Sequence, residues 1–323
     1  MPWPRPSHRK WLFLAVKLVI VAVVVWFLRS TVVEAVAQLR QRPLEWSPAW
    51  LALSGLLYLA GLLPEGVFWH RVLRALEQDA GLGETLRAYF IGHLGKYVPG
   101  KAMVVVLRTG LIRSQRVDTG LAVASVFLET LTMMSVGAFL AAAILAAAFP
   151  EHRAFVGLAI AMMVLAGLPT LPPVFSRLAR LAGVGRSRPA VAEKLAGLHY
   201  RLLTGGWAAM TLGWLLMGAS LWAVLRGTGT TPDLWAQWHL DTAAVAVAVV
   251  GGFVSMIPSG LVVREAVLTG LLQRQLGDPV LALAAPIVLR LVWLVAEVAI
   301  SGILYPLGLR ARHRATEGSG TEE

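Results

Sequence analysis

The sequence lacks several residues and patterns on which protein chemistry commonly depends. It contains no cysteine, which excludes disulfides, thiolate catalysis and thiolate metal sites. Its seven histidines are scattered, with no His-x-x-x-His pair or other metal-ligand spacing, so we expect no metal site and no cofactor. The pattern Gly-x-Ser-x-Gly is absent, and no strand pattern is followed by Gly-x-Gly-x-x-Gly. No motif therefore indicates an enzyme.

Charged residues are also scarce, at 15% of the 323 residues, whereas hydrophobic residues make up 57%. This composition is far more apolar than that of a soluble domain and indicates a membrane protein. We expect a single transmembrane domain over residues 1–310 and a polar, disordered cytoplasmic tail over 311–323. Apolar runs near the length of about 20 residues that crosses a bilayer core predict six crossings, at 11–28, 47–64, 118–149, 154–175, 205–225 and 280–307.

Two further apolar stretches, 86–112 and 242–272, are broken near the middle, the first at Pro99-Gly100 and the second at Pro258-Ser259-Gly260. Proline and glycine interrupt helices, so each stretch is expected to form a helical hairpin. The sequence leaves open whether each hairpin is re-entrant or crosses fully. The predicted fold class is all-α, a polytopic integral membrane protein with about six full crossings plus two Pro/Gly-broken hairpins of opposite orientation.

The formal net charge is +11, which in a soluble protein would suggest a nucleic-acid partner. Here the basic residues follow the positive-inside rule, because the proposed inner segments hold 17 of them and the outer loops hold six. We therefore expect a multi-pass cell-membrane protein with both termini cytoplasmic and no nucleic-acid partner. An alternative for the first run is a cleaved signal peptide ending near Ala35-Val36-Ala37. Its length of about 18 residues exceeds the usual 7–15 and favours a retained anchor.

Residues 95–102 read GKYVPGKA, one hydroxyl short of the phosphate-binding pattern Gly-x-x-x-x-Gly-Lys-[Ser/Thr]. Ala102 offers no oxygen to magnesium, and Pro99 removes one N–H donor from the loop. Because no soluble α/β domain surrounds the stretch, we expect no nucleotide binding. A helix that begins at Pro99 nevertheless presents free N–H groups and the positive end of its dipole beside Lys96 and Lys101. That arrangement predicts an anion site.

The stretch MIPSGLVVREAVL at 256–268 repeats this arrangement, with breaks at Pro258 and Gly260 and with Arg264 about one turn later. The first break is reached from the cytoplasm and the second from outside. Two hairpins of opposite orientation would bring their positive helix ends together, as the broken helices of many transporters do.

Ionisable residues inside a membrane are costly and are functional candidates by default. Beyond those beside the two breaks, the set contains Arg108, Glu129, Glu265, Arg290 and Glu297. Lys101 and Arg108 would share one helix face about 10 Å apart, as would Arg290 and Glu297, which is too far for direct contact. The alternative to a functional role is that the three carboxylates only neutralise Arg108, Arg264 and Arg290 as buried ion pairs.

Three stretches, GHLGKYVPGKAMVVVLRTGL, SVFLETL and GGFVSMIPSGLVVREAVLTGLL, resemble the transmembrane, flippase-like domain of the lysylphosphatidylglycerol synthase family. The resemblance covers nearly the whole chain. It implies a domain that moves aminoacylated phospholipid between leaflets, and the soluble aminoacyl-transfer domain of the family is missing here. The run Ser259-Gly260-Leu261-Val262 departs from the more glycine-rich run of other members, which leaves the geometry of that hairpin open.

The leading hypothesis is a lipid translocase that binds an anionic headgroup, either of a phospholipid or of a polyprenyl phosphate-linked sugar, at the paired helix ends. One alternative is a membrane transferase on a lipid-linked substrate, with Glu129 or Glu265 as general base. Another is an accessory subunit whose charges are structural. The expected substrate-binding residues are Lys96, Tyr97, Pro99, Gly100, Lys101, Arg108, Glu129, Pro258, Gly260, Arg264, Glu265, Arg290 and Glu297.

Overall fold

The computed structural model describes residues 46–98, 102–112, 117–148, 150, 153–181, 183, 193–195, 198–230, 233–255, 260 and 263–318. Within these ranges every regular element is helical, which confirms the predicted all-α class. The elements are α2 (Pro48–Ala75), α3 (Leu82–His93), η1 (Leu94–Tyr97), α4 (Ala102–Leu111), α5 (Thr119–Ala148), α6 (Arg153–Gly167), η2 (Leu168–Thr170), α7 (Pro172–Leu181), α9 (Tyr200–Gly227), α10 (Leu234–Val254), α11 (Val263–Leu276) and α12 (Pro279–Gly318).

Five helices in the described part of the chain, within α2, α5, α9, α10 and α12, are long and apolar enough to cross a membrane. The predicted crossing at 11–28 lies outside the described residues. The run predicted at 154–175 is bent by 65° between Ile160–Thr170 and Pro172–Leu181, and the bent pair would make a sixth span if it crosses as one unit. Pro172 and Pro173 lack the N–H groups that would continue the first helix, which explains the bend.

Two helices are longer than the sequence predicts. α10 passes the test for a crossing by itself over Ala236–Val254, although the sequence placed its start at 242. The polar residues Gln237, His239 and Asp241 interrupt the apolar pattern in the first turns of α10, so the sequence pattern does not show that the helix starts there. α12 continues to Gly318, so residues 311–318 are helical where a disordered tail is expected, and alanine and arginine, which favour helix, make up half of them.

Both broken stretches fold back on themselves as hairpins. In the first, Gly92 packs against Arg108 and Gly95 against Val104, so α3 and α4 run antiparallel. In the second, α10 and α11 are joined at one end by a hydrogen bond from Gln275 Nε2 to Asp241 Oδ1 at 3.0 Å. Their tip ends meet where Gly252 packs against Gly260. Gly260 has φ of +63°, a left-handed backbone that glycine adopts without strain.

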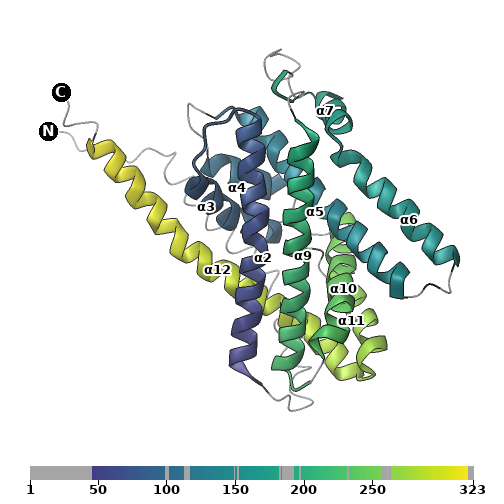
Figure 1. Ribbon diagram of the computed structural model, residues 1–323. Coiled ribbons are helices and arrows are strands. Elements are labelled where there is room, and N and C mark those ends of the chain that lie inside the picture. Colours follow the sequence, from purple (N-terminus) through teal and green to yellow (C-terminus); the bar gives the residue numbers. More distant parts are fainter. Residues whose placement is uncertain are drawn as a thin grey trace.

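The two hairpins enter the bundle from opposite ends, as predicted (Figure 1). α2 and α9 are antiparallel neighbours, because the Ser47 N–H donates to the Gly227 carbonyl at 3.0 Å. α3 therefore starts at the far end of α2, after a short turn, whereas α10 starts at the end where α9 finishes. Lys194 pairs with Glu77 at 3.1 Å and so brings the segment before α9 to the end of α2 where the first hairpin begins.

Glycine at position 95 is required by this close approach. A methyl group added there would lie 2.7 Å from the backbone nitrogen of Val104, and the backbone has no room to yield. We expect Gly95→Ala to lower the stability of the folded protein by about 1–3 kcal/mol, as overpacking usually does. Thermal unfolding in detergent would measure the change.

The matched control is Gly110→Ala in α4 of the same hairpin, where an added methyl group meets no atom within 4 Å. There we expect a gain of about 0.4–1 kcal/mol or no change, because alanine restricts the unfolded chain. If both variants melt at the wild-type temperature, α3 and α4 do not pack at this distance.

Candidate functional site

A cavity of about 460 Å³ lies where the tips of the two hairpins converge. Lys96 and Val98 line it from the first hairpin, and Gly252, Gly260 and Arg264 line it from the second. The remaining walls come from α2, α5, α9 and α12. Ligand pockets in proteins commonly measure about 300–1,000 Å³. Described residues next to both breaks therefore line one cavity of a size suited to a ligand.

Lys96 at the edge of this cavity is neutralised by a carboxylate from α12. Its Nζ donates to Glu297 Oε1 at 2.5 Å and to Tyr58 Oη at 3.1 Å. The Tyr58 hydroxyl donates to the same Glu297 oxygen. Tyr97 is buried beside them, with its ring centroid 5.1 Å from Lys96 Nζ, and does not line the cavity. The pair ties the first hairpin to α12.

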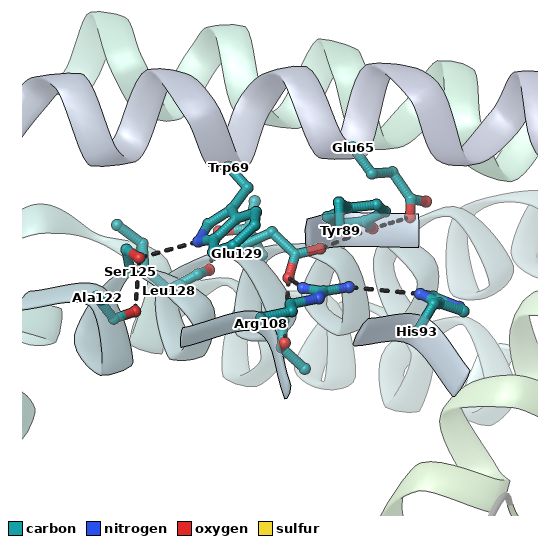
Figure 2. A network of polar contacts seen from close by, with 11 residues as sticks. Glu65, Trp69, Tyr89, His93, Arg108, Ala122, Ser125, Leu128 and Glu129 are labelled. Atoms are coloured by element: carbon teal, nitrogen blue, oxygen red, sulfur yellow. Dashed lines mark hydrogen bonds and ion pairs between the residues drawn. The ribbon is translucent and has the colours of Figure 1, made fainter. Parts of the chain in front are cut away.

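A second ion pair joins α4 to α5 at the cavity wall, and Figure 2 shows its surroundings. Arg108 Nη1 donates to Glu129 Oε2 at 2.6 Å, and Nη2 lies 3.4 Å from His93 Nδ1. The guanidinium also lies over the Tyr89 ring, 3.9 Å from its centroid. Arg108, Glu129 and His93 all line the cavity. Because Arg108 is only 2% exposed, it needs such partners.

The third pair lies behind the cavity. Arg290 on α12 donates from Nη1 to Glu265 Oε1 on α11. Neither residue lines the cavity. Since Arg290 is 3% exposed, the pair holds the second hairpin against α12 through the interior of the protein.

Arg264 differs from these cations because it forms no ion pair with a carboxylate among the described residues. Within the described part of the chain it makes no hydrogen bond and no ion pair within 4.0 Å. Its guanidinium instead lies over the Trp293 ring, 4.3 Å from the centroid. Trp293 in turn stacks on Tyr58 at 4.1 Å. Two aromatic rings thus support a cation that faces the cavity with its hydrogen-bond donors unused.

The ion-pair alternative drawn from the sequence is therefore correct in one pair and different in the other two. Glu129 does neutralise Arg108, as expected. Glu265 pairs with Arg290 instead of its chain neighbour Arg264, and Glu297 pairs with Lys96. As a result of these pairings, Arg264 has no carboxylate partner among the described residues.

Of the predicted binding residues, Lys96, Arg108, Glu129, Gly260 and Arg264 line the cavity. Tyr97, Glu265, Arg290 and Glu297 support its walls. Pro99, Gly100, Lys101 and Pro258 lie outside the described residues. Their roles at the helix ends, like the binding role of the whole set, stay predictions.

A family model described as the lysylphosphatidylglycerol synthase TM region matches residues 14–301. The chain belongs to this family. The match confirms the resemblance seen in the sequence and extends over nearly the whole chain, including every residue of the cavity. The chain is thus a multi-pass membrane protein of the lysylphosphatidylglycerol synthase TM family. A search of curated proteins gives no match.

The cavity of this family member also has an apolar side. Phe127 on α5 lines the cavity and is 53% exposed. Val105, Leu131, Met134 and Phe253 line the same side and are partly exposed. In a membrane protein, apolar side chains such as these can contact lipid tails, which are as apolar as leucine. The lining of the cavity therefore combines cationic and apolar side chains.

Sequence reasoning missed two buried carboxylates of this family member. Glu65 and Asp241 are both 0% exposed. Glu65 directly follows Pro64, where the predicted crossing was ended, and Asp241 directly precedes the predicted start of the second broken stretch. Extending each apolar run by a few residues would have placed both carboxylates inside the membrane and made them candidates.

Proposed function

We propose that this protein binds an anionic lipid headgroup in the cavity between the hairpins and moves the lipid between leaflets. The observation that carries the proposal is Arg264, a cation that lines the cavity and has no carboxylate partner among the described residues. Arg264 is only partly exposed, so a charge-assisted hydrogen bond to an anionic ligand would be favourable there. A phosphate suits a guanidinium well, because its oxygens accept two parallel hydrogen bonds.

The electrostatics of the cavity favour an anion over a cation or a neutral ligand. Lys96, Arg108 and Arg264 all lie close enough to His93 for their charges to act on it. In the described part of the chain, these three cations form ion pairs with two carboxylates, Glu129 and Glu297. The wall therefore keeps a net positive charge in its present pairing.

The shape of the cavity favours a lipid over a free anion. A headgroup at Arg264 would leave its acyl chains to lie along the apolar part of the lining, where Phe127 is 53% exposed. The family match supports a role in lipid metabolism or transport. The transferase alternative is weaker, because Glu129 and Glu265 are both engaged by guanidinium groups and so are poor general bases.

Reconstitution would test the proposal. Purified full-length protein would be placed in phosphatidylcholine vesicles that carry fluorescently labelled phosphatidylglycerol, labelled polyprenyl phosphate-linked sugar or labelled phosphatidylcholine. An impermeant quencher then reports how much label has reached the outer leaflet. We expect accelerated exchange of one anionic lipid and not of phosphatidylcholine, relative to protein-free vesicles. Chemical conversion of the lipid would instead favour the transferase, and no change in either anionic lipid would overturn the translocase.

We also propose that the end of the bundle where α2 ends and α9 begins faces the cytoplasm. Arg71, Arg74, Arg87, Lys194 and Arg201 all belong to segments at this end. Arg226 and Arg274 belong to the opposite end. This distribution follows the positive-inside rule and would place the end of α12 in the cytoplasm as well.

The absence of cysteine makes this orientation simple to test. Tyr200→Cys lies at the proposed inner end and Gln273→Cys at the outer end, and both positions are exposed. We expect a membrane-impermeant maleimide to label Gln273→Cys in intact cells and Tyr200→Cys only after lysis. The reverse pattern would invert the orientation, and labelling of both from outside would contradict the opposed hairpins.

A further inference from the structure

Glu65 is a buried carboxyl group that the proposed binding of lipid does not use. It lies on α2, is 0% exposed and does not line the cavity. One oxygen, Oε2, lies 2.8 Å from the Tyr89 hydroxyl, and the other, Oε1, has no hydrogen-bond partner. No lysine or arginine in the described part of the chain forms an ion pair with it.

The hydrogen bonds around Tyr89 require an additional proton. The Tyr89 oxygen lies 2.8 Å from Glu65 Oε2 and 3.1 Å from Glu129 Oε1. A phenol has one proton and can donate to only one of two carboxylates. The second contact is a hydrogen bond only if that carboxyl group carries a proton and donates it to the Tyr89 oxygen. Glu129 forms an ion pair with Arg108 at 2.6 Å, whereas Glu65 forms none with a described residue, so Tyr89 donates to Glu129 and Glu65 carries the proton.

The charges on the surrounding helices also indicate that Glu65 and Glu129 hold one proton between them. The titratable groups that face Glu65 are Tyr89 and His93 on α3, Arg108 on α4 and Glu129 on α5, and α9 meets it with Gly213. Lys96 also acts on it from the cavity edge, but Glu297 neutralises that charge. The buried cluster thus contains two carboxyl groups, Glu65 and Glu129, and one cation, Arg108, that is not neutralised by a carboxylate outside the cluster. It is neutral when the two carboxyl groups share one proton.

We propose that Glu65, Tyr89 and Glu129 form a proton site that fills when an anion occupies the cavity, so that headgroup and proton bind together. This inference rests on the proposed anion site. An anion that binds at Arg264 and also engages Arg108 draws the Arg108 guanidinium away from Glu129 and leaves that buried carboxylate without a cation. Glu129, released from Arg108, then takes up one proton from water through the cavity and becomes a neutral acid, while Glu65 keeps its own. When the anion leaves, Glu129 returns its proton to water and pairs with Arg108 again.

Infrared spectroscopy would test the resting state without any ligand. A neutral carboxylic acid has a C=O stretch distinct from that of a carboxylate. We expect the difference spectrum of wild type against Glu65→Gln at neutral pH to show loss of an acid band. Glu129→Gln should lose the same band, because Glu65 must then ionise to balance Arg108. Buried Asp241 contributes equally to all three proteins and cancels. An acid band that persists in both variants would overturn the shared proton.

Calorimetry would test the coupling. Full-length protein in a nonionic detergent would be titrated with short-chain phosphatidylglycerol in two buffers of different ionisation enthalpy, which yields the protons exchanged per lipid bound. We expect uptake of about one proton, and affinity that falls as pH rises. Binding without proton uptake would overturn the coupling and leave the proposed function intact. Absence of binding to wild type would remove both.

A control distinguishes this cluster from the other carboxylate at the cavity. Glu297 neutralises Lys96 and could accept a proton if an anion engaged that lysine instead. Glu297→Gln should therefore still take up about one proton per lipid. If the uptake disappears in this variant, the proton binds at Glu297 and the assignment to Glu65 and Glu129 is wrong.

Discussion

Replacing Arg264 with alanine is expected to weaken the binding of anionic lipid by about 10- to 150-fold while the melting temperature stays at the wild-type value. A charge-assisted hydrogen bond contributes about 1.5–3 kcal/mol, and each 1.4 kcal/mol changes Kd tenfold. Stability should be unaffected because Arg264 has no carboxylate partner among the described residues, so its removal strands no buried charge. Titration with phosphatidylglycerol and thermal unfolding in detergent measure the two effects.

Two further variants separate binding from folding. Arg264→Lys keeps the charge but loses the planar group that lies over Trp293, so we expect intermediate affinity. Arg290→Ala removes the partner of Glu265 and should destabilise the fold by about 3–5 kcal/mol, because it strands a carboxylate. If Arg264→Ala unfolds the protein, Arg264 is a structural residue and the proposed anion site fails.

The fold was largely predictable because its signals are local. Run length alone identifies the long helices, since a bilayer core demands about 20 apolar residues. Proline and glycine at the two breaks identify the hairpins for the same reason, because their effect on the backbone does not depend on distant contacts. The start of α10 was predicted too late because its first turns depend on a distant contact. Asp241 resembles a helix boundary in the sequence, but its carboxylate accepts a hydrogen bond from Gln275 within the second hairpin.

Two of the three charge pairs could not be predicted, because they depend on which helices pack together. The sequence suggests that Arg290 and Glu297 share a helix face. Glu297 instead pairs with Lys96, which lies 201 residues earlier in the chain. No local pattern encodes the packing of η1 against α12 that makes this pair. Arg264 shows why this matters: its lack of a carboxylate partner among the described residues, on which the proposed function depends, becomes visible only when the partners of Glu129, Glu265 and Glu297 are known.

The second large effect is expected at Arg108. We expect Arg108→Gln to destabilise the protein by about 3–5 kcal/mol, because it leaves a fully buried carboxylate without its cation. Arg108→Gln combined with Glu129→Gln should recover much of the loss, since neither residue of the pair then carries a charge. Thermal or denaturant unfolding of the two single variants and the double variant measures the interaction between the partners.

The two single variants should not cost the same. Glu129→Gln leaves Arg108 with Glu65, which can ionise and balance the cation through Tyr89. Arg108→Gln leaves two carboxyl groups and no cation between them, so a second proton must be taken up to keep the cluster neutral. We therefore expect Glu129→Gln to be the milder change at neutral pH, and Arg108→Gln to regain stability as pH falls, because protonation removes the stranded charge. Equal losses that do not change with pH would mean that Glu65 takes no part in the charge balance around Arg108.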